Sequence, residues 1–134
     1  MTFVLDASVA MSWCFEDETT PASENVLDLL AVQDALVPAL WVYEVTNVLA
    51  VAERRRRLTE AQSAHFLDLL HQLPIGVAES PPDATALLDV ARRHQISAYD
   101  AAYLALAAQH GLALATLDSQ LAARASDAGV TVLS

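Results

Sequence analysis

The chain has 134 residues, of which 54% are hydrophobic and three are glycine. This length and composition allow one sizeable hydrophobic core and exclude a disordered or linker-like chain. The formal net charge of −10, from 17 acids and seven bases, argues against a protein that holds nucleic acid by bulk electrostatics. It does not exclude a nucleic-acid enzyme whose acids are neutralised by bound metal.

The sequence predicts no membrane-spanning segment. No apolar run approaches the roughly 18 residues that a transmembrane helix needs. The N-terminus also lacks the basic region and apolar stretch of a secretory signal. The single cysteine, Cys14, offers no intrachain disulfide. We therefore expect a cytoplasmic protein.

The first predicted element is a strand at residues 3–5, apolar throughout, as strands are when helices cover both faces of a parallel sheet. Further strands are predicted at residues 35–37, 75–78, 112–116 and 130–133. Helices are predicted at residues 8–15, from 19–21 onward, at 40–57, 59–73, from 80–83 to about 94, 97–110 and 119–128. This alternation predicts an α/β fold: a three-layer α/β/α sandwich on a short, mainly parallel central sheet of four to five strands, forming one domain over residues 1–134.

Four of the acids differ from the others, which fit loops, polar helix faces or caps. Asp6 and Asp118 each follow an apolar strand, and ligands of open α/β sheets lie outside the carboxyl ends of strands. Glu44 and Asp100 lie early in two helices that are apolar nearly all round, as buried helices are. A carboxylate in apolar surroundings must be protonated, paired or bound to a metal, and Mg²⁺ and Mn²⁺ prefer oxygen ligands. The four acids together therefore predict a divalent-metal site.

Taken singly, each acid also has a structural role open to it. Asp6 and Asp118 would serve well as helix N-caps. Negative charge is also favourable in the first turns that hold Glu44 and Asp100. These roles do not explain why all four acids lie amid apolar sequence, so the metal site is the favoured interpretation.

Four segments carry a resemblance to a known family. In chain order they are residues 4–10 (VLDASVA), 44–49 (EVTNVL), 97–103 (SAYDAAY) and 115–118 (ATLD). They resemble the motifs of PIN domains, in particular those of the VapC toxins of bacterial toxin–antitoxin pairs, and the similarity covers essentially the whole chain. The resemblance implies a PIN fold and an endoribonuclease that hydrolyses RNA phosphodiester bonds with Mg²⁺ or Mn²⁺.

The resemblance also implies roles for the individual acids. Asp6, Glu44 and Asp100 match the three core metal-binding and catalytic acids of the family. Asp118 matches a fourth acid, which varies more among family members. In such a site one or two ions would activate a water and polarise the scissile phosphate.

Other polar residues match less specific positions. Ser8 and Thr116 match small hydroxyl positions beside the acids, where they would orient the acids or the substrate. Asn47 shares a helical face with Glu44 and would either support the site or form a hydrogen bond within the core. A basic run at the end of the long helix would stay solvated, contact RNA phosphates or meet an acidic partner surface. This run is Arg54, Arg55, Arg56 and Arg57.

The implied partners are RNA as substrate and a VapB-like antitoxin. The resemblance implies a homodimer that forms a heterotetramer or larger complex with the antitoxin. The two central helices are apolar on more than one face, which suits both a dimer contact and an antitoxin groove. One alternative stays open: a PIN fold that keeps its acids but serves as an RNA- or protein-binding module without significant nuclease activity.

Overall fold

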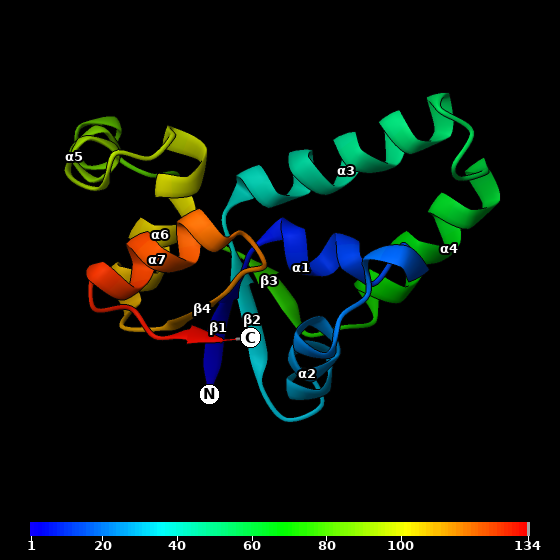
Figure 1. Cartoon of the computed structure of the whole chain (residues 1–134), viewed down its shortest axis with the longest axis horizontal. Helices are drawn as coiled ribbons and strands as arrows, with labels where there is room; N and C mark the ends of the chain where they lie inside the picture. The colour runs from blue at the N-terminus through cyan, green and yellow to red at the C-terminus, as the bar shows by residue number, and fades with distance from the viewer. Residues whose placement is uncertain (134) are drawn as a thin grey trace.

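The computed structural model describes residues 1–133 and contains a central five-stranded sheet flanked by helices (Figure 1). Its strands are β1 (Thr2–Leu5), β2 (Asp34–Val37), β3 (Ile75–Val77), β4 (Ala113–Ala115) and β5 (Val132–Leu133). Their order across the sheet is β3-β2-β1-β4-β5, and every pairing is parallel. The predicted α/β sandwich with a short parallel sheet is confirmed.

The helices are α1 (Ala7–Ser12), α2 (Pro21–Leu29), α3 (Ala39–Arg54), α4 (Glu60–His71), α5 (Ala84–His94), α6 (Ala98–His110) and α7 (Ser119–Asp127), with a 3₁₀ turn η1 (Glu16–Glu18). The connections from β1 to β2 and from β2 to β3 run toward one edge of the sheet, and the later ones run toward the other. Because parallel crossovers are right-handed, α1 to α4 cover one face and α5 to α7 cover the opposite face, as Figure 1 shows. Between Met1 and Leu133, no helix is both long enough and apolar enough to cross a membrane.

The connections change direction between the neighbouring strands β1 and β4. The crevice outside the carboxyl ends of these two strands is therefore the topological switch point, where open α/β sheets bind their ligands. The backbone N–H of Asp6, just beyond β1, donates to the carbonyl of Ala115 at the end of β4 (2.9 Å). This bond fixes the two strand ends beside each other.

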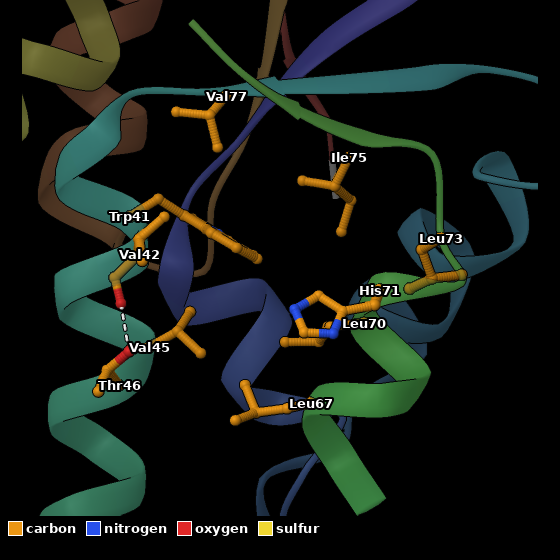
Figure 2. Close-up of a pocket in the computed structure, with 10 residues that line it drawn as sticks. All are labelled: Trp41, Val42, Val45, Thr46, Leu67, Leu70, His71, Leu73, Ile75 and Val77. Carbon is orange, nitrogen blue, oxygen red and sulfur yellow. Dashed lines mark hydrogen bonds between the residues drawn. The ribbon is translucent and has the colours of Figure 1, made fainter. Parts of the chain in front are cut away.

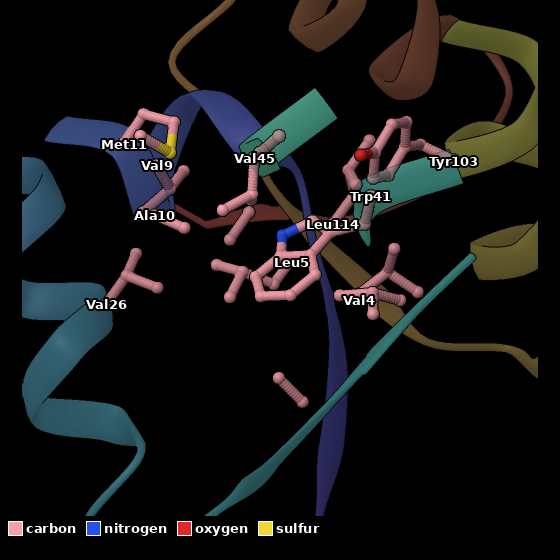
Figure 3. Packing of buried hydrophobic residues seen from close by; sticks show 14 of the residues in the cluster. Val4, Leu5, Val9, Ala10, Met11, Val26, Trp41, Val45, Tyr103 and Leu114 are labelled. Atoms are coloured by element: carbon pink, nitrogen blue, oxygen red, sulfur yellow. The ribbon is translucent and has the colours of Figure 1, made fainter. Parts of the chain in front are cut away.

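The core lies on both sides of β1 and β4. Val4, Leu5 and Leu114 on these strands have no exposed surface. Figure 3 shows them packed with Trp41 of α3 and Tyr103 of α6. Side chains that directly follow these strands are thus anchored to the most deeply buried part of the sheet.

Capping residues set several helix ends. Thr20 caps the N-terminus of α2 and Thr59 that of α4, in reciprocal capping boxes with Ser23 and Gln62 respectively. Gly111 ends α6 in the left-handed conformation, with φ of 64°. Threonine hydroxyls accept the free N–H groups at helix starts and glycine readily adopts a positive φ at a helix end, so these residue types mark helix boundaries in the sequence.

The helix predicted over residues 8–15 is shorter in the structure and ends at Ser12. Beyond it, Phe15 is extended, and the indole of Trp13 donates a hydrogen bond to the carbonyl of Ser23 on α2 (2.8 Å). The chain leaves the helix early because Trp13 and Phe15 pack against their neighbours, and the acidic residues that follow form the turn η1.

The helix predicted over residues 40–57 ends at Arg54. Arg56 is left-handed, with φ of 59°, and its N–H donates to the carbonyl of Glu53 (3.0 Å). The N–H of Arg57 then reaches back to the carbonyl of Ala52 (2.8 Å). This pair of bonds is a Schellman motif, in which a residue other than glycine occupies the left-handed position.

The expectation that the long helix is buried nearly all round is wrong. Its buried residues form one stripe: Trp41, Val45, Leu49 and Ala52. Val42 and Tyr43 are 45% and 73% exposed. One side of α3 packs on the core, and apolar side chains on its other sides remain open.

Replacing Arg56 by glycine should raise the free energy of unfolding by about 1 kcal/mol, since left-handed backbone costs an L-residue roughly that much. Denaturant unfolding of the variant and the wild type measures this difference. Arg55→Gly is the matched control, because Arg55 has a negative φ of −87°, and this change should lower stability. Equal destabilisation in both variants would contradict the claim that the backbone at Arg56 is strained.

Candidate active site

The four predicted acids lie on four elements that meet at the switch point. Asp6 follows β1, Asp118 follows β4, Glu44 is in the second turn of α3, and Asp100 is in the first turn of α6. Burial raises the pKa of Glu44; a hydrogen bond from Tyr103 opposes this increase, and the charges of Asp6 and Asp100 add to it. Burial also raises the pKa of Asp100, with added contributions from Asp118 and Asp6. Asp6, Glu44 and Asp100 are therefore within range of one another's charge, and Asp118 is within range of Asp100.

Asp6 is buried and is held by two hydroxyl groups. Its Oδ2 accepts hydrogen bonds from Ser8 Oγ and Thr116 Oγ1, both at 2.7 Å. Each hydroxyl in turn accepts a backbone N–H, from Leu117 and Asp118 respectively, at 3.1 Å. Asp6 occupies the N-cap position of α1 but makes no side-chain cap bond. The N-cap alternative is therefore wrong for Asp6, whose carboxylate is oriented toward the strand ends.

Asp118 is exposed and does cap a helix. Its Oδ1 accepts the backbone N–H groups of Gln120 (2.9 Å) and Leu121 (3.1 Å) at the start of α7. The predicted structural alternative is thus realised for this acid. The expectation of apolar surroundings is wrong for Asp118, although its second oxygen accepts no hydrogen bond from residues 1–133.

Glu44 is half-buried and is bonded to a residue that sequence reasoning missed. Tyr103 of α6, which is 1% exposed, donates a hydrogen bond of 2.5 Å from its hydroxyl to Glu44 Oε1. Burial raises the pKa of Tyr103, and its hydrogen bond to Glu44 and that residue's charge raise it further. The signal for Tyr103 was its position three residues after Asp100, on the same face of the helix.

Asn47 lies three residues after Glu44 but is exposed on α3. The alternative in which it forms a hydrogen bond within the core is therefore wrong. Its side chain makes no hydrogen bond in the part of the chain that the structure describes. A supporting role at the site remains a prediction.

One arginine of the basic run contacts neighbouring side chains, and the other three are exposed to solvent. Arg57 pairs with Asp17 (3.3 Å) and lies 4.3 Å from the centre of the Phe15 ring. Arg54, Arg55 and Arg56 are exposed and make no ion pair with any residue from 1 to 133. Arg57 therefore closes the end of α3 onto η1, and the other three are available to a partner.

The donor atoms at the switch point suit a hard divalent cation. Each acid keeps at least one carboxylate oxygen without a protein hydrogen bond in the described chain: Asp6 Oδ1, Glu44 Oε2, Asp118 Oδ2 and both oxygens of Asp100. None of the four is in an ion pair with another described residue. No three His, Cys, Asp or Glu side chains in residues 1–133 form a compact ligand cluster. The four carboxylates therefore influence one another's charge without converging on one point.

A family profile of the PIN domain matches residues 3–126 of the chain. The chain belongs to the PIN domain family. It is also 35% identical over 127 residues to Ribonuclease VapC3 of Pyrobaculum aerophilum, a match that covers 91% of this chain and 93% of that protein. The predicted resemblance to PIN domains and to VapC proteins is confirmed.

Solved structures share the fold. The crystal structure of PAE2754 from Pyrobaculum aerophilum has a TM-score of 0.70 and 26% identity, covering 98% of this chain and 92% of that one. VapBC2 from Rickettsia felis, bound to a DNA fragment from its promoter, has a TM-score of 0.71 and covers 98% and 97%. Its identity is 11%, so this second likeness concerns the fold alone.

Neutralising Asp100 should stabilise the metal-free protein near pH 7. Because the folded-state pKa of Asp100 lies above its ordinary 3.8, the folded chain binds more protons than the unfolded chain just above that value, so this carboxyl lowers stability as pH rises. The advantage of Asp100→Asn should therefore shrink as pH falls toward 4. Thermal unfolding with a chelator present measures it. Asp68→Asn, at an exposed position on α4, is the control, and an equal pH-dependent gain there would contradict the site-specific repulsion.

Proposed function

We propose that this chain is a divalent-metal-dependent endoribonuclease and the toxin of a toxin–antitoxin pair. The observation that carries the proposal is the meeting of Asp6, Glu44 and Asp100 at the switch point without a cationic partner in residues 1–133. Such a set of acids is suited to metal rather than to an ion pair. The 35% identity to a protein named Ribonuclease VapC3 supports RNA as the substrate.

In this proposal Asp6, Glu44 and Asp100 hold Mg²⁺ or Mn²⁺. Asp118 contributes Oδ2, the oxygen that does not cap α7. The bound ion would supply Lewis-acid chemistry, activating a water and stabilising the leaving oxygen of the phosphodiester. Ser8 and Thr116 keep Asp6 fixed in one orientation. Without an ion the acids repel the phosphates of RNA, so substrate binding and cleavage both require the metal.

The three exposed arginines, Arg54 to Arg56, lie at the end of α3 far from Glu44. Arg54 follows Glu44 by ten residues, which is about 15 Å of helix. They are therefore placed to contact phosphates away from the scissile bond, or an acidic segment of the antitoxin. Arg57 is less suited to either role because it already pairs with Asp17.

A VapB-like antitoxin has a candidate docking site in an apolar groove of about 230 Å³ between α3, α4 and β3. Figure 2 shows the Trp41 ring extending from α3 and the His71 ring pointing in from α4. The indole N–H of Trp41 is buried and has no acceptor among residues 1–133. An apolar segment of the antitoxin would fill this groove.

The exposed face of α5 suits self-association. This helix has no buried residue, packs against α6, and leaves Leu88 49% exposed. We propose that a second copy of the chain covers it, giving a homodimer that assembles with the antitoxin into a heterotetramer or larger complex. The free toxin would act in the cytoplasm, where its RNA substrates are.

Removing a carboxylate from the site should abolish RNA cleavage. Asp6→Asn, Glu44→Gln and Asp100→Asn are each expected to reduce Mn²⁺-dependent cleavage of RNA by roughly 1,000-fold, because a catalytic metal contributes several kcal/mol. Gel analysis of RNA incubated with the purified variants measures the effect. Asp28→Asn, an exposed change on α2, should cleave like the wild type.

The same experiment tests the alternative function. A wild type that binds RNA but does not cut it in either metal would favour a binding module. Equal residual cleavage in all variants would indicate a contaminating nuclease and would remove support for the enzymatic proposal.

A charge in the groove should block antitoxin binding and leave cleavage intact. Val42→Asp, at a 45% exposed position, would place an unpaired carboxylate against an apolar partner and weaken its affinity at least about tenfold. Calorimetric titration with a purified VapB-like partner measures the affinity. Val32→Asp, at a 78% exposed position outside the groove, is the control, and comparable loss in both would argue for a different docking surface.

A further inference from the structure

Tyr103 connects the two helices that carry Glu44 and Asp100. Its hydroxyl donates to Glu44 Oε1 on α3, and its backbone lies three residues after Asp100 on α6. Residues at this spacing project from the same face of a helix. The hydrogen bond therefore ties the position of Glu44 to the helix that presents Asp100.

Core packing fixes the ring of Tyr103 in the absence of any ligand. It is 1% exposed and belongs to the packed core around Leu114 and Trp41 (Figure 3). A phenol held in this way places its hydroxyl at one point, whereas a glutamate side chain alone samples several rotamers. The hydrogen bond from this fixed hydroxyl therefore restricts the Glu44 side chain to fewer conformations.

The bond also distinguishes the two oxygens of Glu44. Oε1 accepts the Tyr103 hydroxyl, and Oε2 accepts no hydrogen bond from residues 1–133. We propose that Tyr103 is a positioning residue that presents Oε2 of Glu44 to the divalent ion, without itself touching metal or RNA. This inference rests on the proposed metal-dependent nuclease and adds a determinant of its metal affinity.

Residues that orient metal ligands typically change metal affinity or activity by 10- to 100-fold. Tyr103→Phe removes the hydroxyl and keeps the ring in the core. We expect the dissociation constant for Mn²⁺, titrated alone and followed by electron paramagnetic resonance, to rise about tenfold. Excess Mn²⁺ should restore much of the RNA cleavage, because the acids themselves remain.

A double-variant comparison tests whether Tyr103 acts through Glu44. In the Glu44→Gln background, adding Tyr103→Phe should change Mn²⁺ affinity by less than twofold. Tyr99→Phe is the matched control: Tyr99 is on the same helix, is 65% exposed and makes no side-chain hydrogen bond with described residues. It should bind Mn²⁺ like the wild type.

The outcomes separate this inference from the proposed function. If Tyr103→Phe lowers the melting temperature but binds Mn²⁺ as tightly as the wild type, Tyr103 is only structural and the inference is overturned, while the nuclease proposal stands. If Tyr103→Phe does not fold, an undiminished Mn²⁺ affinity in Glu44→Gln overturns it equally. If the wild type binds no Mn²⁺, or Asp6→Asn binds it as well as the wild type, both proposals fail.

Discussion

Repulsion between carboxylates gathered at one edge of a parallel sheet is the constraint on which the site depends. Within residues 1–133 the ion pairs lie elsewhere: Arg57 with Asp17 and Glu18, Arg93 with Asp89, and Arg124 with Asp127. Neutral donors hold the acids instead, with two hydroxyls on Asp6 and a phenol on Glu44. Neutral donors orient a carboxylate without cancelling its charge, so the site keeps the negative potential that attracts a divalent cation.

The fold could be predicted because its local signals agree with one another. Apolar strands, capping threonines and the glycine after α6 all indicate a parallel sheet between helices, and the carboxyl ends of such strands lie at one edge. The end of α3 could not be predicted in this way. A run of four arginines contains no glycine or proline, yet Arg56 takes the left-handed conformation that ends the helix, and Arg57 beyond it contacts Phe15 and Asp17.

The acids of the proposed site could be picked out from the sequence, whereas the contacts of Tyr103 and the exposure of Asn47 could not. Asp6 and Asp118 are marked by the strands before them, but that Asp118 uses one oxygen as a cap and leaves the other open is a matter of geometry. Tyr103 lies 59 residues from Glu44 in sequence. Their bond depends on how α3 and α6 are placed relative to each other, which the periodicity within either helix does not specify. Exposure of Asn47 likewise follows from the side of α3 that the core covers.

Helix α3 links the proposed activities in space. Glu44 faces the proposed site, while its neighbours Val45 and Thr46 line the apolar groove, so an occupant of the groove lies within about one helical turn of this proposed metal ligand. Displacing α3 would strain the Glu44–Tyr103 hydrogen bond and through it the placement of Oε2. In the proposed nuclease, a groove occupant that displaced α3 would therefore lower metal affinity without entering the site. Inhibition by such an occupant would need no contact with the proposed RNA-cleaving centre, because the buried phenol of Tyr103 would transmit the displacement.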